Sequence, residues 1–238
     1  MTPPPFAFLS LFGQAWEFVF DGRQAEIGTV RVGGPEQVIE LATTQLEVTL
    51  LALGAALLIA LPAGIALGHF GRGEFLAVSV GNAGRALPEL ALSALMAAAI
   101  GVGLVNLVVA LAILGIPPIL TNAYVGIRQV DNSVVEAARG MGMGNLAIAT
   151  RVELPLAVPP VMGGIRTAAI NIVATATIAP LAGILTLGDF ILARNVYGDA
   201  GVLAGAILVA LMALAFEAVL AGLQWRLTPR SLRETRVS

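Results

Sequence analysis

Long apolar runs separated by short polar stretches dominate this chain. Five of the runs carry few charged residues and are long enough for a helix of roughly 17–25 residues, which crosses the hydrocarbon core of a bilayer. Helices satisfy all their backbone hydrogen bonds internally, as a lipid environment demands. The pattern therefore predicts an all-α membrane protein with about five transmembrane helices, at about residues 43–67, 83–101, 105–127, 158–181 and 201–223.

Residues 1–42 are expected to form a separate N-terminal segment, ahead of a transmembrane domain at 43–225 and a tail at 226–238. The apolar run at 6–20 is short and contains Gln14 and Glu17, which predicts an interfacial helix with Trp16 at headgroup level. The stretch from there to Glu40 is rich in charge and is expected to be solvated. Near the fourth span, residues 177–190 are apolar but rich in Gly and Pro, which leaves room for a further short segment.

A polar stretch around residues 131–155 separates the third and fourth spans and predicts a helix, a turn and a second helix. Ser133 and Glu136 have the spacing of a capping box at the start of the first helix. Gly142 suits the left-handed residue that ends it, and Asn145 is expected to cap the second helix. That helix is expected to stop near Leu154, because the residue before Pro155 disfavours helical geometry.

Arginine placement predicts the orientation of the spans, since positively charged loops stay in the cytoplasm. Nine of the thirteen Arg residues fall in the loop after the first span, in the polar stretch or in the tail, whereas three fall on the opposite side. Five spans then place the N-terminus outside and the C-terminus in the cytoplasm of a multi-pass cell-membrane protein. The polar stretch is cytoplasmic in this arrangement.

Composition excludes several kinds of function. Hydrophobic residues make up 58% of the chain and charged residues 12%, against roughly 25% charged in a soluble domain. Lysine is absent, so the chain lacks a P-loop for ATP. With one His and no Cys, no transition-metal site is expected, and the net charge of −2 argues against nucleic acid as a partner. We expect no catalytic residues.

The polar stretch resembles a known motif. Glu136-Ala137-Ala138, then Gly142 six positions after Glu136, then Val152-x-Leu154-Pro155 are similar to the EAA loop of ABC importer permeases, EAA-x3-G-x9-I-x-LP, with Val where Ile is usual. The runs Gly84-Arg85-Ala86-Leu87-Pro88, Ile116-Pro117-Pro118-Ile119-Leu120-Thr121-Asn122 and Ala138-Arg139-Gly140-Met141-Gly142-Met143 resemble permeases for osmoprotectants such as glycine betaine, choline, carnitine or proline betaine. The resemblance covers about residues 43–230.

The resemblance implies a fold, partners and a mechanism. It implies a type I importer permease whose coupling loop docks on a separate cytoplasmic ATPase that uses ATP and Mg²⁺, so that this chain binds no cofactor itself. It also implies an extracytoplasmic solute-binding protein and a second permease, either a copy or a paralogue. The residues that would couple to the ATPase are Glu136, Ala137, Ala138, Gly142, Leu154 and Pro155, to which we add Arg139 and Arg151 for their charge.

Polar residues at membrane depth are candidates for the translocation path, because such groups face either neighbouring helices or water. The candidates are Asn122, Asn171 and Thr175; hydrogen bonding between helices is the alternative for each. Glu217 is expected to pair or to reach the cytoplasmic face. The patterns Gly64-x-x-x-Gly68 and Gly201-x-x-x-Gly205 predict close helix contacts.

Three rival functions remain at this level. A permease for another small solute, such as an amino acid, would share the coupling loop. A secondary transporter would carry inverted repeats and functional intramembrane carboxylates, and the chain has no evident internal repeat. A non-transporting membrane assembly subunit is the third.

Overall fold

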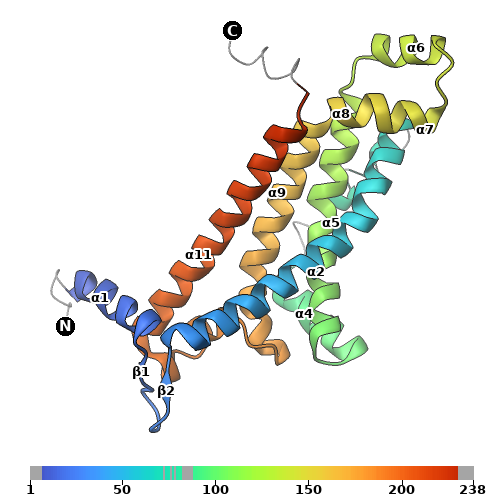
Figure 1. Ribbon diagram of the computed structural model, residues 1–238. Helices are drawn as coiled ribbons and strands as arrows, with labels where there is room; N and C mark the ends of the chain where they lie inside the picture. The colour runs from blue at the N-terminus through green and yellow to red at the C-terminus, as the bar shows by residue number, and fades with distance from the viewer. Residues whose placement is uncertain (1–6, 72, 76, 78, 82–87, 230–238) are drawn as a thin grey trace.

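Four long helices lie side by side and form most of the molecule (Figure 1). The computed structural model describes residues 7–71, 73–75, 77, 79–81 and 88–229. In the described residues these four helices are long and apolar enough to cross a membrane. They are α2 (Gly34–His69), α5 (Leu104–Arg128), α9 (Val158–Thr175), which the 3₁₀ segment η2 (Ala176–Ala182) continues, and α11 (Arg194–Leu227).

Two of these helices extend well beyond a bilayer core. α2 has 36 residues, so it is about 50 Å long at a rise of 1.5 Å per residue. α11 has 34 residues but is kinked at Gly198, whose φ and ψ of 66° and −175° are not helical. The part of α11 after the kink, residues 199–227, is about 45 Å long, and both lengths exceed a bilayer core of about 30 Å. α2 begins at Gly34 with Pro35 in its first turn, where the missing N–H costs nothing. Residues 34–40, expected to be a solvated stretch, are therefore helical, and α2 crosses the expected boundary at residue 42.

Four of the five expected spans are confirmed as helices of sufficient length, and the second is not. Residues 83–87 of the run at 83–101 lie outside the described residues. The described part of that run forms α4 (Glu89–Ile100), which has 12 residues and packs on α5 and η2. Two glycines with positive φ, Gly101 and Gly103, end α4 and separate it from α5.

Close contact between α2 and α5 organises the main core. A Cβ at Gly64 would lie 2.7 Å from the Cβ of Ala123 and 2.8 Å from the carbonyl oxygen of Leu120. At Gly68 it would lie 2.7 Å from the Cβ of Ile127. The first Gly-x-x-x-Gly pattern is thus confirmed as a helix contact in which the missing side chains let two backbones approach.

A smaller core lies at the opposite end of the bundle from the polar stretch. It joins α1 (Ala7–Phe20), the two-stranded hairpin β1 (Arg23–Gln24) and β2 (Arg31–Val32), α10 (Gly188–Leu192) and the start of α11 (Figure 1). Phe18, Phe190 and Tyr197 meet edge to face with centroids 5.0–6.1 Å apart. Gly205 packs against Phe190, and α10 is the further short segment anticipated near the fourth span.

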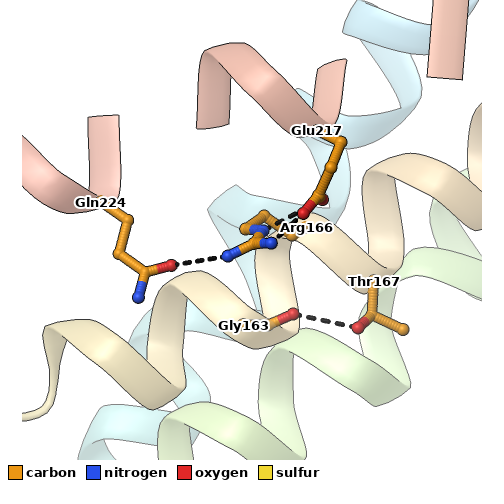
Figure 2. Close-up of polar contacts among 5 residues, drawn as sticks. All are labelled: Gly163, Arg166, Thr167, Glu217 and Gln224. Atoms are coloured by element: carbon orange, nitrogen blue, oxygen red, sulfur yellow. Dashed lines mark hydrogen bonds and ion pairs between the residues drawn. The ribbon is translucent and has the colours of Figure 1, made fainter. Parts of the chain in front are cut away.

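An ion pair joins α9 to α11 within the spans. Figure 2 shows Arg166 directed toward Glu217 and Gln224 of α11, whereas Thr167 bonds back to Gly163 of its own helix. Nε of Arg166 lies 3.0 Å from Oε2 of Glu217, Nη2 bonds to the second carboxylate oxygen, and Nη1 lies 3.0 Å from the amide oxygen of Gln224. The expectation that Glu217 is paired is confirmed, and the pairing offsets the cost of two charges at membrane depth.

The first helix, α1, presents three different faces. Ala15 and Phe18 are buried against the small core, whereas Phe12, Trp16 and Phe20 are exposed at intervals of four residues. Gln14 and Glu17 lie on the remaining side. One apolar aromatic face, one polar face and one protein-facing side are the pattern of a helix that lies in a membrane interface.

We expect Gly64→Ala to destabilise the protein by about 1–3 kcal/mol, since the new methyl group must displace the α5 backbone. Gly54→Ala is the matched control on the same helix, because a Cβ there has no neighbour within 4 Å. Thermal unfolding in detergent measures both variants. Equal melting temperatures for the two would show that the α2–α5 contact is not as close as described.

Trp16 is predicted to contact lipid near the headgroups. The chain has two Trp residues, so Trp225→Phe leaves Trp16 as the only indole emitter. In proteoliposomes, lipids brominated close to the headgroup should quench its fluorescence more than lipids brominated near the chain end. Strong quenching by aqueous acrylamide together with none by brominated lipid would place α1 in water.

Candidate functional site

The polar stretch forms four short helical segments at one end of the bundle (Figure 1). α11 ends at the same end of the bundle, whereas α1 and the hairpin lie at the other. We call these segments the coupling loop. They are α6 (Asn132–Gly140), α7 (Asn145–Ile148), the π-helix η1 (Ala149–Glu153) and α8 (Leu154–Leu156).

The cap of α6 is Asp131, so the expected capping box at Ser133 is wrong. The Asp131 carboxylate accepts the backbone N–H of Ser133 at 2.8 Å, and this hydrogen bond lowers the pKa of Asp131 below its usual value. A carboxylate is favoured at a helix N-terminus by hydrogen bonding and by the helix dipole together. The helix therefore starts one residue before Ser133, and Glu136 lies in its middle.

The turn after α6 follows the prediction for Gly142. Its φ is +82°, in the left-handed region that favours glycine. The Gly142 N–H donates to the carbonyl of Arg139, and the Met143 N–H donates to that of Ala138, which is the Schellman pattern. Asn145, in contrast, is the first residue of α7 rather than its cap, because Gly144 occupies the cap position.

The second helix does not stop before Pro155, which corrects the expectation for Leu154. Leu154 has helical φ and ψ of −59° and −45°, and the helical path continues through Pro155 into α8. The preceding turn is a π-helix. Its wider hydrogen-bond spacing relieves the clash that the proline ring makes with the carbonyl four residues earlier in an α-helix.

The two halves of the coupling loop differ in burial. In α6, Glu136, Ala137 and Arg139 are exposed, and Ala138 is the buried residue. Beyond the turn, Ile148, Ala149 and Glu153 are buried against the bundle. The base of the loop is therefore fixed, while α6 and the turn face solvent.

Two apolar side chains at the tip escaped the sequence analysis. Met141 is 76% exposed and Leu146 is 78% exposed, on either side of Gly142. They are large apolar side chains on an otherwise polar segment. The only feature of the sequence that could have identified Met141 and Leu146 is their position close to the glycine turn.

A buried polar contact ties the coupling loop to α2. Nδ1 of His69, the last residue of α2, lies 2.7 Å from Oε2 of Glu153 in η1, and each side chain is 6% exposed. No local pattern in the sequence pairs His69 with Glu153, because 84 residues separate the two.

Two of the three candidate path residues meet in one pocket. Asn122 of α5 and Asn171 of α9 line a pocket of about 240 Å³, and Asn122 Nδ2 also donates to the Pro118 carbonyl at 2.8 Å. The other residues that line the pocket are Gly81, Leu114, Pro117, Pro118, Thr121 and Thr167.

Thr175 lies outside the residues that line this pocket. Its hydroxyl donates to the carboxylate of Glu89 at 2.8 Å and joins α9 to α4. Thr175 thus makes the hydrogen bond between helices that was the alternative for it. It still shares a face of α9 with Thr167 and Asn171, since each of these positions is four residues from the next.

Relatives of known name cover most of the chain. The chain is 37% identical over 192 residues to the carnitine transport permease protein OpuCB of Listeria monocytogenes, which corresponds to 80% of this chain and 88% of that protein. It is 35% identical over 189 residues to the glycine betaine/carnitine/choline transport system permease protein OpuCB of Bacillus subtilis, or 79% and 87% of the two chains. The osmoprotectant import permease protein OsmY of Salmonella typhimurium is 37% identical over 181 residues, or 74% and 76%.

Solved structures share the fold. A chain of the MetNI methionine ABC transporter in an inward-facing conformation superimposes with a TM-score of 0.72 at 18% identity, covering 82% of this chain and 98% of that one. A chain of an amino acid ABC transporter gives 0.62 at 22% identity, covering 81% and 94%. At these identities the likeness concerns the fold alone.

A family model described as "binding-protein-dependent transport system inner membrane component" matches residues 56–232. This range includes three of the four long helices whole and the last part of α2 (residues 56–69), together with the entire coupling loop. The chain therefore belongs to the family of inner membrane components of binding-protein-dependent transport systems.

Proposed function

We propose that the chain is the permease subunit of an ATP-driven importer for osmoprotectants. The observation that carries the proposal is the coupling loop, whose base is buried in a transmembrane bundle and whose tip is exposed. A motor subunit that binds such a tip can move the spans by moving the loop. The chain has no lysine, so ATP and Mg²⁺ are bound and used by a separate ATPase subunit.

The docking surface consists of the exposed side of α6 and the turn. Glu136, Ala137 and Arg139 supply polar groups and a flat patch, while Met141 and Leu146 supply apolar anchors. Ala138, Leu154 and Pro155 act from inside, because they are buried or half-buried and hold the loop on the bundle. Arg151 is exposed on η1 and is placed to meet acidic groups of the ATPase.

The pocket between α5 and α9 is the proposed part of the translocation path in this chain. Asn122 and Asn171 offer amide groups, and Thr121 and Thr167 offer hydroxyls, to a solute that passes. Such a lining is polar without charge, so it compensates a zwitterion for lost water without holding it tightly. Thr175 continues the same face of α9 toward α4.

The named relatives suggest the solute class. Their names specify carnitine, glycine betaine, choline and osmoprotectants, and the first three solutes carry a quaternary ammonium group. Aromatic cages usually recognise this group, yet Tyr124 lies in the main core and Trp225 near the end of α11. Trp16 and Tyr197 both lie at the end that carries the small core, but Tyr197 is buried there whereas Trp16 is exposed. We therefore assign solute recognition to a separate binding protein that docks on the end formed by α1, the hairpin and α10.

Orientation and assembly follow the same proposal. The coupling loop and the end of α11 face the cytoplasm, and α1 with the hairpin faces outside, in agreement with the distribution of Arg residues. A second permease, either another copy or a paralogue, completes the pore, because the pocket between α5 and α9 of one chain has a volume of only about 240 Å³.

Reconstitution tests the function directly. The permease, its ATPase and its binding protein in liposomes should take up labelled glycine betaine, choline or carnitine when ATP is supplied on the ATPase side. Uptake driven by an ion gradient without ATP would identify a secondary transporter instead. A binding screen of the partner binding protein with these solutes, proline and methionine separates an osmoprotectant importer from one for amino acids.

Gly142→Val is predicted to weaken assembly with the ATPase. A left-handed conformation costs a residue other than glycine about 1–2 kcal/mol, which is roughly tenfold in the population of the correct turn. Gly140→Ala is the control, since it also adds a side chain into open space but its φ is negative. Co-purification of the ATPase and transport should fall for the first variant and stay near wild type for the second. Unchanged co-purification of Gly142→Val would move the interface elsewhere.

A further inference from the structure

We infer that the His69–Glu153 contact is the joint through which movement of the coupling loop reaches the transmembrane helices. The inference rests on the proposed function, because it concerns how the docking of the ATPase is transmitted. His69 and Glu153 are positioning residues in this scheme: they contact neither ATP nor the solute. They hold the base of the loop on the end of α2.

The π-helix explains how Glu153 comes to face inward. Residues 149–153 turn more widely than an α-helix, so the side chains after Ile148 are rotated relative to an uninterrupted helix. Arg151 and Thr150 then face solvent, whereas Glu153 is buried. Single π turns are often found at functional positions, and here the turn also accommodates Pro155.

The chemistry of the contact makes it strong and specific. The imidazole N–H donates to a carboxylate at 2.7 Å, the short distance typical of charge-assisted hydrogen bonds. Both side chains are almost fully buried, so separating them would leave a carboxylate without its described partner in an apolar setting. Breaking the contact would therefore carry a large free-energy penalty, so the loop and α2 are expected to move together.

The other side of the joint is rigid as well. Gly68, adjacent to His69, lies so close to α5 that a Cβ there would come within 3.0 Å of the Tyr124 carbonyl oxygen and 2.7 Å of Ile127. A displacement passed to His69 therefore acts on α2 and α5 as one unit. α5 is one of the two helices that form the proposed path, and its residue Asn122 lies two positions before Tyr124.

The path from the ATPase to this joint is continuous in the described residues. α6 rests on η1 through a side that includes the buried Ala138, and the Met143 N–H bonds to the Ala138 carbonyl across the turn. η1 carries Glu153, and Glu153 holds His69. A push on the exposed tip thus reaches α2 through packed segments.

The test measures solute transported per ATP hydrolysed by the reconstituted complex. His69→Ala and Glu153→Ala should each lower this ratio by about two- to thirtyfold, while the ATPase still co-purifies and still hydrolyses ATP. The double variant should be no worse than either single one, because the same contact is lost. Glu153→Gln keeps an oxygen that accepts the imidazole N–H and should retain most of the coupling.

Gln45→Leu is the matched control. Gln45 is also a buried polar residue of α2, and its amide donates to the Val173 carbonyl of α9 at 3.1 Å. It ties α2 to another helix without touching the coupling loop. A merely structural role for His69 predicts that Gln45→Leu and His69→Ala behave alike, with lower stability and the same transport per ATP.

A covalent replacement decides the matter even if the alanine variants are unstable. The chain has no cysteine, so His69→Cys together with Glu153→Cys creates a unique pair for a short thiol cross-linker, with the wild-type complex treated in parallel. Cross-linking should restore transport per ATP in the double variant.

No change on cross-linking, or alanine variants that couple like wild type, would overturn the inference. A wild-type complex that fails to transport with ATP would instead refute the proposed function.

Discussion

Close approach of helix backbones is the constraint on which the rest of this structure depends. Apolar side chains gain little by leaving lipid for a protein core, so spans are held by packing and by hydrogen bonds between helices. Gly64 and Gly68 let α2 approach α5 until a single added carbon would clash. The two helices then act as one body, on which the pocket beside Asn122 and the joint at His69 both depend.

Polar contacts complete what this packing begins, and each connects a different pair of elements. Arg166 joins α9 to Glu217 of α11, Thr175 joins α9 to Glu89 of α4, and Gln45 joins α2 to α9. Such groups are costly at membrane depth unless they find partners. Their pairing specifies which helices are neighbours, whereas apolar surfaces alone would tolerate several arrangements.

The coupling loop combines a fixed base with an exposed tip, and local chemistry explains both. Asp131 caps the start of α6 and Gly142 ends the helix, so α6 is a compact unit that projects from the bundle. The π turn at 149–153 lets the chain pass Pro155 without breaking and turns Glu153 toward His69. A permease that receives force from a separate motor needs both parts, since a flexible base would absorb the motion.

The sequence by itself determined the features that depend on neighbours along the chain. Apolar runs specified four long helices, and Gly142 specified a left-handed turn, because no other residue adopts that conformation so cheaply. The predicted cap at Ser133 was wrong because the Asp131 carboxylate caps the helix instead. The predicted stop at Leu154 was wrong because a π turn lets the helical path continue through Pro155. The tertiary structure alone decided the contacts between distant residues, such as His69 with Glu153 and Arg166 with Glu217. Side chains 84 and 51 residues apart meet only after the helices pack, and no local pattern encodes that meeting.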